Sequence, residues 1–244
     1  MRIEIWSDVV CPWCYVASAR FDKALAGFPH RDQVEVVHRS FELDPGHDGS
    51  HTEPVTRFLT ARFGPQGPAM DEHVAALARR ERLRYRTDRL VGSTLDAHRL
   101  LHLAKEEGRQ HELLNVLFEA NFAEAETIFT HDALLELAVK AGLDRVRAAG
   151  VLADTEAYLD AVREDESEAA RAGARGVPFF AFSRRHGLSG AQTVETFAEA
   201  LQSAWDEQYP GDFAAPTAVC GPDGTCALPI PHDSAGVGSV GTAR

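Results

Sequence analysis

Two cysteines separated by two residues stand near the start of the chain, in the segment Cys11-Pro12-Trp13-Cys14. A short alternating apolar run precedes them and a helical pattern follows, so a strand gives way to a helix here. Cys11 then lies in the first turn of that helix, where unsatisfied backbone N–H groups and the helix dipole stabilise a thiolate. The pattern predicts an exposed nucleophile, Cys11, and an inward-facing thiol, Cys14, that closes a disulfide with it.

Three other interpretations of these two thiols are open. They could be buried packing residues, they could form a static disulfide, or they could supply half of a zinc site. Pro12 indicates a deliberate turn at the helix start, and a cross-link across so short a loop adds little stability. A four-thiolate zinc site would need Cys220 and Cys226, whose five-residue spacing matches a zinc knuckle poorly, so we expect no metal.

Cys220 and Cys226 flank a Pro-Asp-Gly turn, which can bring their sulfur atoms within bonding distance. This second cysteine pair could form a local disulfide, act as a second redox pair, or consist of free thiols. The residues around it are rich in Gly, Pro, Ala and Ser, so we expect a flexible tail.

Other polar residues have spacings that could serve catalysis or metal binding. Asp8 lies three residues before Cys11, where a carboxylate could relay a proton to or from Cys14. It could equally face solvent or cap the turn. His98 and His102 lie one helical turn apart, the spacing of two metal ligands, but without an obvious third ligand we expect a polar helix face.

The composition is that of a soluble globular protein. The 244 residues, 44% of them hydrophobic, can fill a core without cross-links. With 25 basic and 37 acidic residues the net charge is −12, which argues against nucleic-acid or anionic-membrane binding. No apolar run could span a bilayer and no signal-like segment precedes the first strand, so we expect a cytoplasmic protein, where cysteines are more often catalytic than structural.

The hydrophobic patterns divide the chain into three parts. Two strands with a helix between them come first, then a long helical stretch, then two strands and a helix, at residues 2–6, 14–26, 34–41, 52–171, 177–182, 188–191 and 193–208. This order predicts a βαβ–ββα domain from residues 1–50 plus 173–209. An all-helical insertion at 51–172 and a C-terminal tail at 210–244 complete the chain.

Five segments of the chain occur together in one known family: Ser7-Asp8-Val9-Val10-Cys11-Pro12-Trp13-Cys14-Tyr15, Phe41-Glu42-Leu43-Asp44-Pro45, Ala97-His98-Arg99-Leu100, Gly176-Val177-Pro178-Phe179-Phe180 and Ser189-Gly190-Ala191-Gln192. With these segments, the chain resembles the DsbA-like thioredoxin-fold proteins, and most of all their FrnE branch. The likeness spans about residues 2–201. It implies an α/β, thioredoxin-like fold with a large helical insertion that covers the edge of the active site.

The resemblance also implies a thiol-disulfide oxidoreductase without a cofactor, in which Cys11 attacks and Cys14 resolves. Pro178 is then expected to follow a cis peptide bond and to face the two cysteines. Such a bond exposes the backbone of Val177, with which an extended substrate segment could pair.

Pro12 and Trp13, between the cysteines, are expected to contact the substrate as well. Secreted DsbA proteins have His at the position of Trp13, and an indole supplies no positive charge to the thiolate. We therefore expect a less oxidising disulfide than theirs.

Enzymes of related fold and one non-enzymatic role are alternatives. The 2-hydroxychromene-2-carboxylate isomerases and kappa-class glutathione transferases share the inserted frame, but they typically have Ser for the first cysteine and lack the second. A chaperone or binding module would use the groove beside Pro178 without thiol chemistry. The expected partners are thiol-containing protein clients or small thiols such as glutathione, and the chain could be a monomer or a homodimer.

Overall fold

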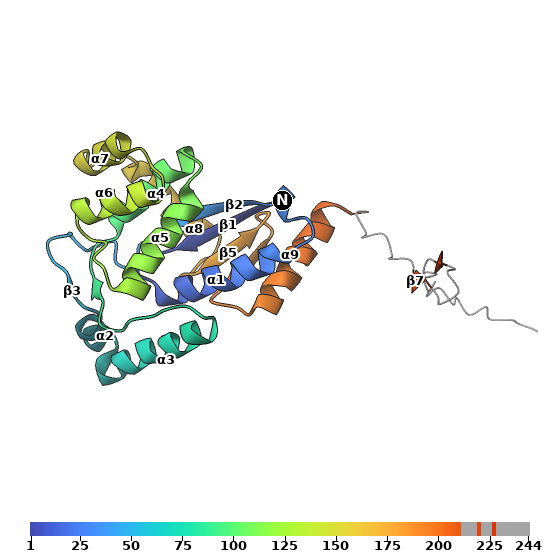
Figure 1. Cartoon of the computed structure of the whole chain (residues 1–244), viewed down its shortest axis with the longest axis horizontal. Coiled ribbons are helices and arrows are strands. Elements are labelled where there is room, and N and C mark those ends of the chain that lie inside the picture. Colours follow the sequence, from blue (N-terminus) through green and yellow to red (C-terminus); the bar gives the residue numbers. More distant parts are fainter. Residues whose placement is uncertain (211–218, 221–225, 228–244) are drawn as a thin grey trace, which may run out of the picture. The chain divides into compact units, whose positions relative to one another are not determined.

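A four-stranded mixed sheet carries the cysteine segment (Figure 1). The computed structural model of the chain describes residues 1–210, 219–220 and 226–227. The strands, in the spatial order β2-β1-β5-β6, are β1 (Arg2–Ser7), β2 (Glu35–Ser40), β5 (Phe179–Phe182) and β6 (His186–Ser189). Because β1 is parallel to β2 and antiparallel to β5, the sheet has the predicted βαβ–ββα topology.

Helices cover both faces of this sheet: α1 (Pro12–Ala26) and α9 (Val194–Gln208) on one, and α8 (Leu159–Arg171) on the other. On the first face the rings of Phe21, Phe180 and Phe197 pack together, with centroids 4.6 to 5.6 Å apart. On the second, Trp6 Nε1 donates to the carbonyl of Asp165 at 2.7 Å. Burial on both faces explains why β5 consists of apolar residues throughout.

The segment between β2 and β5 is mainly helical, as predicted. Its helices before α8 are α2 (Val55–Phe63), α3 (Gly67–Arg80), α4 (Leu95–Glu106), α5 (Gln110–Phe118), α6 (His131–Lys140) and α7 (Arg145–Ala153). Two short strands, β3 (Glu53–Pro54) and β4 (Leu90–Val91), pair antiparallel within it. Strands this short show no alternation in the sequence, so the patterns did not predict them.

A π-helical turn, Glu119–Glu124, directly follows α5. The ring of Tyr15 on α1 packs there against Phe118 and Phe122, with centroids 5.6 and 5.0 Å away. Ala125 ends the turn with a left-handed φ of 54°. Helical spacing in the sequence does not distinguish this turn from a continuing α-helix.

The cysteine segment and the insertion share one hydrophobic core. Residues Met1–Trp205 form one compact unit. Its main apolar cluster contains Val9 and Cys14 together with Leu100 and Leu117 of the insertion. The cysteine segment therefore lies at the junction of the two parts. The boundaries at residues 51 and 172 stay a prediction.

Residues Asp206–Arg244 form a second unit. Within it β7 (Val219–Cys220) pairs antiparallel with β8 (Cys226–Ala227), so Cys220 lies opposite Cys226 in the register. The predicted tail flexibility and the state of these two thiols lie outside the described residues. None of the described helices is long and apolar enough to cross a membrane.

Candidate active site

Cys11 is the N-cap residue of α1, directly before Pro12. Its extended backbone (φ −78°, ψ 113°) and Pro12 in the first turn start the helix. The amides of Cys14 and Tyr15 donate to its carbonyl at 3.0 and 3.3 Å. Its side chain forms no capping hydrogen bond, so the sulfur atom is available at the helix start.

Both thiols are free and nearly buried, with 4% of Cys11 and 2% of Cys14 exposed. The expectation that Cys11 is exposed is therefore wrong, because the insertion packs around it. The two cysteines still differ in access, since Cys11 lines a cavity and Cys14 lies outside its lining. Burial raises the pKa of the Cys14 thiol well above its ordinary value, and the adjacent Cys11 and the charge of Asp8 add to this rise.

The Val177-Pro178 peptide bond is cis, as the family resemblance implies. It precedes β5 and places the carbonyl oxygen of Val177 3.7 Å from Cys11 Sγ. Val177 also lines the cavity beside Cys11. The structure thus brings together two segments that are separated by more than half of the sequence.

Asp8 lines the same cavity as Cys11 with 1% of its surface exposed, so a solvent-facing position is excluded. Its Oδ2 accepts a hydrogen bond from the amide of Leu43 at 2.7 Å, and its Oδ1 accepts one from the amide of Val10 at 3.3 Å. These bonds give both oxygen atoms of the buried carboxyl group a partner. The charge of Asp8 acts on the Cys14 thiol.

His98 and His102 are buried, with 1% and 8% of each residue exposed. The expected polar helix face is therefore wrong. His98 Nε2 lies 3.5 Å from Asp8 Oδ1, whereas His102 Nε2 lies 3.3 Å from Asp165 Oδ2. The two rings thus serve different carboxylates. Among the described residues, no group of three or more His, Cys, Asp or Glu side chains is placed to hold a metal ion.

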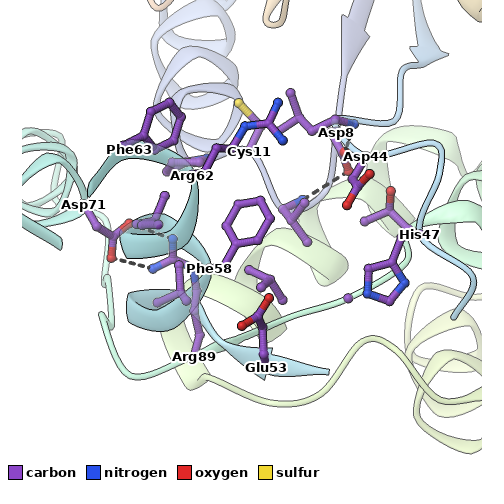
Figure 2. Close-up of a pocket in the computed structure, with 18 of the residues that line it drawn as sticks. Asp8, Cys11, Asp44, His47, Glu53, Phe58, Arg62, Phe63, Asp71 and Arg89 are labelled. Atoms are coloured by element: carbon purple, nitrogen blue, oxygen red, sulfur yellow. Dashed lines mark hydrogen bonds and ion pairs between the residues drawn. The ribbon is translucent and has the colours of Figure 1, made fainter. Parts of the chain in front are cut away.

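A cavity of about 630 Å³ opens beside Cys11 (Figure 2). Helices α2 and α3 form one part of its wall, so the insertion covers the active-site edge as expected. Four large apolar side chains that are exposed also line it: Trp13, Leu43, Phe63 and Met70. Exposed apolar surface gathered around one cavity is typical of a ligand or partner site.

Two arginines in the cavity wall differ in their pairing. Arg89 is buried and bonds Asp71 through both of its terminal nitrogens, at 2.7 and 2.9 Å (Figure 2). Arg62, on α2, lies over the ring of Phe58, and no described carboxylate pairs with it. Figure 2 shows its guanidinium on the Cys11 side of the cavity. No motif in the sequence indicated that these insertion residues belong to the site.

Comparisons with known proteins show a likeness along most of the chain. Residues 2–202 match the DSBA-like thioredoxin domain. A solved structure of a probable DsbA oxidoreductase from Streptomyces coelicolor is 54% identical, with a TM-score of 0.82 over 94% of this chain and 100% of that chain. The uncharacterized protein YwbO of Bacillus subtilis (strain 168) is 28% identical over 212 residues, which are 85% of this chain and 98% of that protein.

A more distant likeness concerns the fold alone. A structure of a 2-hydroxychromene-2-carboxylate isomerase is 14% identical, with a TM-score of 0.62 over 85% of this chain and 98% of that chain. The inserted thioredoxin frame therefore accommodates different reactions, and the reaction must be argued from the site. On the match that runs from residue 2 to residue 202, this chain belongs to the family of the DSBA-like thioredoxin domain.

Proposed function

We propose that this chain is a thiol-disulfide oxidoreductase that exchanges a Cys11–Cys14 disulfide with the thiols of its substrates. The pair of free thiols at the start of α1 carries this proposal, because Cys11 lines the cavity and Cys14 is buried behind it. Disulfide exchange requires this arrangement: substrates reach the nucleophilic thiol, but they do not reach the second thiol.

The reaction transfers two electrons between the dithiol and a substrate disulfide. In the reductive direction, the Cys11 thiolate attacks one substrate sulfur, the substrate S–S bond breaks, and one thiolate leaves. Cys14 then gives its proton to a base and attacks Cys11 Sγ. The mixed disulfide breaks, the second substrate thiolate leaves, and the Cys11–Cys14 disulfide forms. The reverse sequence oxidises a substrate dithiol.

Asp8 is the base that we assign to Cys14. Cys14 needs one because burial raises the pKa of its thiol. Asp8 is buried next to it, and the charge of Asp8 acts on Cys14 directly. A carboxylate at this place can accept the proton in one direction of the reaction and return it in the other.

The substrates that fit the site best are protein clients with apolar residues beside a cysteine. Trp13 and Leu43 are exposed at the cavity, and the Val177 backbone beside Cys11 could pair with an extended client segment. Small thiols such as glutathione are the second class. We also assign the chain to the FrnE branch, on the Cys-Pro-Trp-Cys segment, and to the cytoplasm, because four cysteines are too few for a disulfide scaffold.

An isomerase of the 2-hydroxychromene-2-carboxylate type is a second candidate. An apolar cavity of about 630 Å³ with the cation of Arg62 in its wall would suit an aromatic carboxylate. Cys14 argues against this function, because isomerisation needs no second thiol beside Cys11.

Serine variants test the proposed function. We expect Cys11→Ser to lower insulin reduction to background, because the attacking sulfur is lost. Cys14→Ser should still attack substrates and should accumulate mixed disulfides that mass spectrometry detects. Cys220→Ser is the matched control and should keep the wild-type turnover. Full turnover by Cys11→Ser, or isomerase activity that does not need Cys14, would contradict the proposal.

A further inference from the structure

His98 places an ionisable side chain of the insertion beside Asp8, the carboxylate three residues before Cys11. It lies on α4 with 1% of its surface exposed, and Nε2 is 3.5 Å from Asp8 Oδ1. Neither ring nitrogen has a hydrogen-bond partner among the described residues. A buried imidazole without such partners needs another source of stabilisation, and a nearby opposite charge can provide it.

The groups that face His98 are mainly carboxylates. Asp8 comes from the loop after β1, Glu42 from the segment after β2, and Glu166 from α8. Arg163 of α8 offsets part of their charge, since it bonds Glu42 at 2.7 Å and Glu166 at 2.8 Å. Three carboxylates and one guanidinium leave an excess of negative charge, which favours a cation at the position of His98.

This balance of charges decides the protonation of the ring. Burial lowers the pKa of His98, but Asp8, Glu42 and Glu166 outweigh burial and hold that pKa above its ordinary value. The surroundings thus favour the protonated ring more than water does. The protonated ring is also the form that makes an ion pair with Asp8.

We propose that protonated His98 is a positioning residue that holds Asp8 in its carboxylate form, so that Asp8 can take the proton from Cys14 in the second step of disulfide exchange. This inference rests on the proposed function, because it needs Cys14 to act as the resolving thiol. The contact matters because a buried carboxylate needs an opposite charge beside it, and His98 supplies one at 3.5 Å from Asp8 Oδ1.

The proton and the electrons balance in that step. The proton moves from Cys14 Sγ to Asp8, while His98 keeps its own. The Cys14 thiolate forms a bond to Cys11 Sγ as the bond from Cys11 to the substrate breaks. The substrate leaves as a thiolate with two electrons, the two cysteines become a disulfide, and Asp8 later releases its proton to solvent.

His102 is the matched control for this role. It lies one turn further along α4 and is buried too, but its Nε2 contacts Ser40 Oγ at 3.2 Å and Asp165 at 3.3 Å instead of Asp8. A His102→Gln change thus removes a buried imidazole from the same helix without touching Asp8.

The test separates the two steps with dithiobis(nitrobenzoate), a disulfide whose thiolate product is coloured. Attack by Cys11 releases the first thiolate, and attack by Cys14 on the mixed disulfide releases the second. All proteins in the test carry Cys220→Ser and Cys226→Ser, so that only Cys11 and Cys14 react. Stopped-flow traces from about pH 5 to about pH 9 then give both rates for this parent protein and for its His98→Gln, His102→Gln, Asp8→Asn and combined His98 and Asp8 variants.

We expect His98→Gln to keep the first rate and to slow the second about tenfold at neutral pH, with the acid limb of its pH profile moved up by about one unit. His102→Gln should leave that profile unchanged. The double variant should be no slower than Asp8→Asn, because His98 acts through Asp8. An unchanged second-step profile in His98→Gln would overturn the inference.

Two further measurements keep the test decisive. If His98→Gln does not fold, the imidazole nitrogen shifts of the reduced wild type report the ring directly, and a neutral His98 ring at pH 7 would overturn the inference. If Cys14→Ser released the second thiolate at the wild-type rate, the proposed function would be wrong, whatever the result for His98.

Discussion

At the scale of the residue, Trp13 presents an uncharged indole beside the nucleophile Cys11. It is 37% exposed, and its ring lies 6.2 Å from the ring of His73, so its side chain faces the cavity and not the core. Its indole brings an apolar surface to the substrate site but no charge. Compared with proteins that have His at this position, the Cys11 thiolate therefore lacks the positive charge of a neighbouring imidazolium, which would make the disulfide more oxidising.

Replacing Trp13 by His should make the Cys11–Cys14 disulfide more oxidising. An imidazolium at this position would stabilise the thiolate and with it the reduced form. We expect the reduction potential to rise by about 30 mV, which corresponds to a tenfold change in the equilibrium constant. A glutathione titration measures it, with Trp13→Phe as a control that keeps the wild-type potential. An equal potential for both variants would show that charge at this position does not control the couple.

At the scale of the element, helix α2 converts the open edge of the sheet domain into a cavity wall. Phe58, Leu59, Arg62 and Phe63 recur at helical spacing and line the cavity, whereas Arg57 lies outside the lining. Arg57 is 81% exposed and pairs with Glu53 at 3.4 Å. One helix face therefore supplies both apolar surface and the cation of Arg62 to the site.

Arg62→Gln should weaken selectivity for anionic substrates. We expect a three- to fivefold slower attack by Cys11 on dithiobis(nitrobenzoate), roughly the effect of one partly exposed charge, and no change with the neutral dithiodipyridine. The difference should shrink at high salt, since screening weakens the field of the guanidinium. Arg57→Gln on the same helix is the control. Equal slowing with both disulfides would indicate a distorted wall in place of lost charge.

At the scale of the whole molecule, buried ionisable groups set the pH range of stability. Burial and the nearby His111 lower the pKa of His38 to about 3. Burial raises the pKa of Glu4, but hydrogen bonds from Arg184 and Arg39 outweigh it and lower that pKa to about 2. Both groups bind a proton more readily in the unfolded chain, so both favour unfolding in acid.

His38 acts at mildly acidic pH, between its ordinary pKa of 6.5 and its folded value of about 3. In this window the unfolded chain binds a proton that the folded chain does not. The free energy of unfolding should therefore fall by about 1.4 kcal/mol per pH unit on this account. Urea unfolding of the wild type and of His38→Gln near pH 7 and pH 5 measures this slope. The His38→Gln variant should lose less stability between these pH values than the wild type does. The control His51→Gln, which removes an exposed histidine, should lose as much as the wild type. Equal slopes for the wild type and His38→Gln would contradict the assignment.

The sequence by itself determined the dithiol and the frame that carries it. The reason is that both depend on local signals: Pro12 between two cysteines at a strand-to-helix boundary, and apolar periods that change from strand to helix and back. The order βαβ, helical insertion, ββα followed from these signals. The family resemblance added the cis bond before Pro178, which no local pattern requires.

Only the tertiary structure decided what surrounds the sulfur atoms. The contact between Asp8 and His98 joins two segments ninety positions apart, and helical spacing cannot say which side of α4 meets a buried carboxylate. The prediction of a polar face failed for the same reason, because an ion pair compensates the burial of an imidazole. Cys11 is buried and Arg62 reaches the cavity because the insertion folds back over the helix start, a long-range packing event that leaves no trace in local sequence.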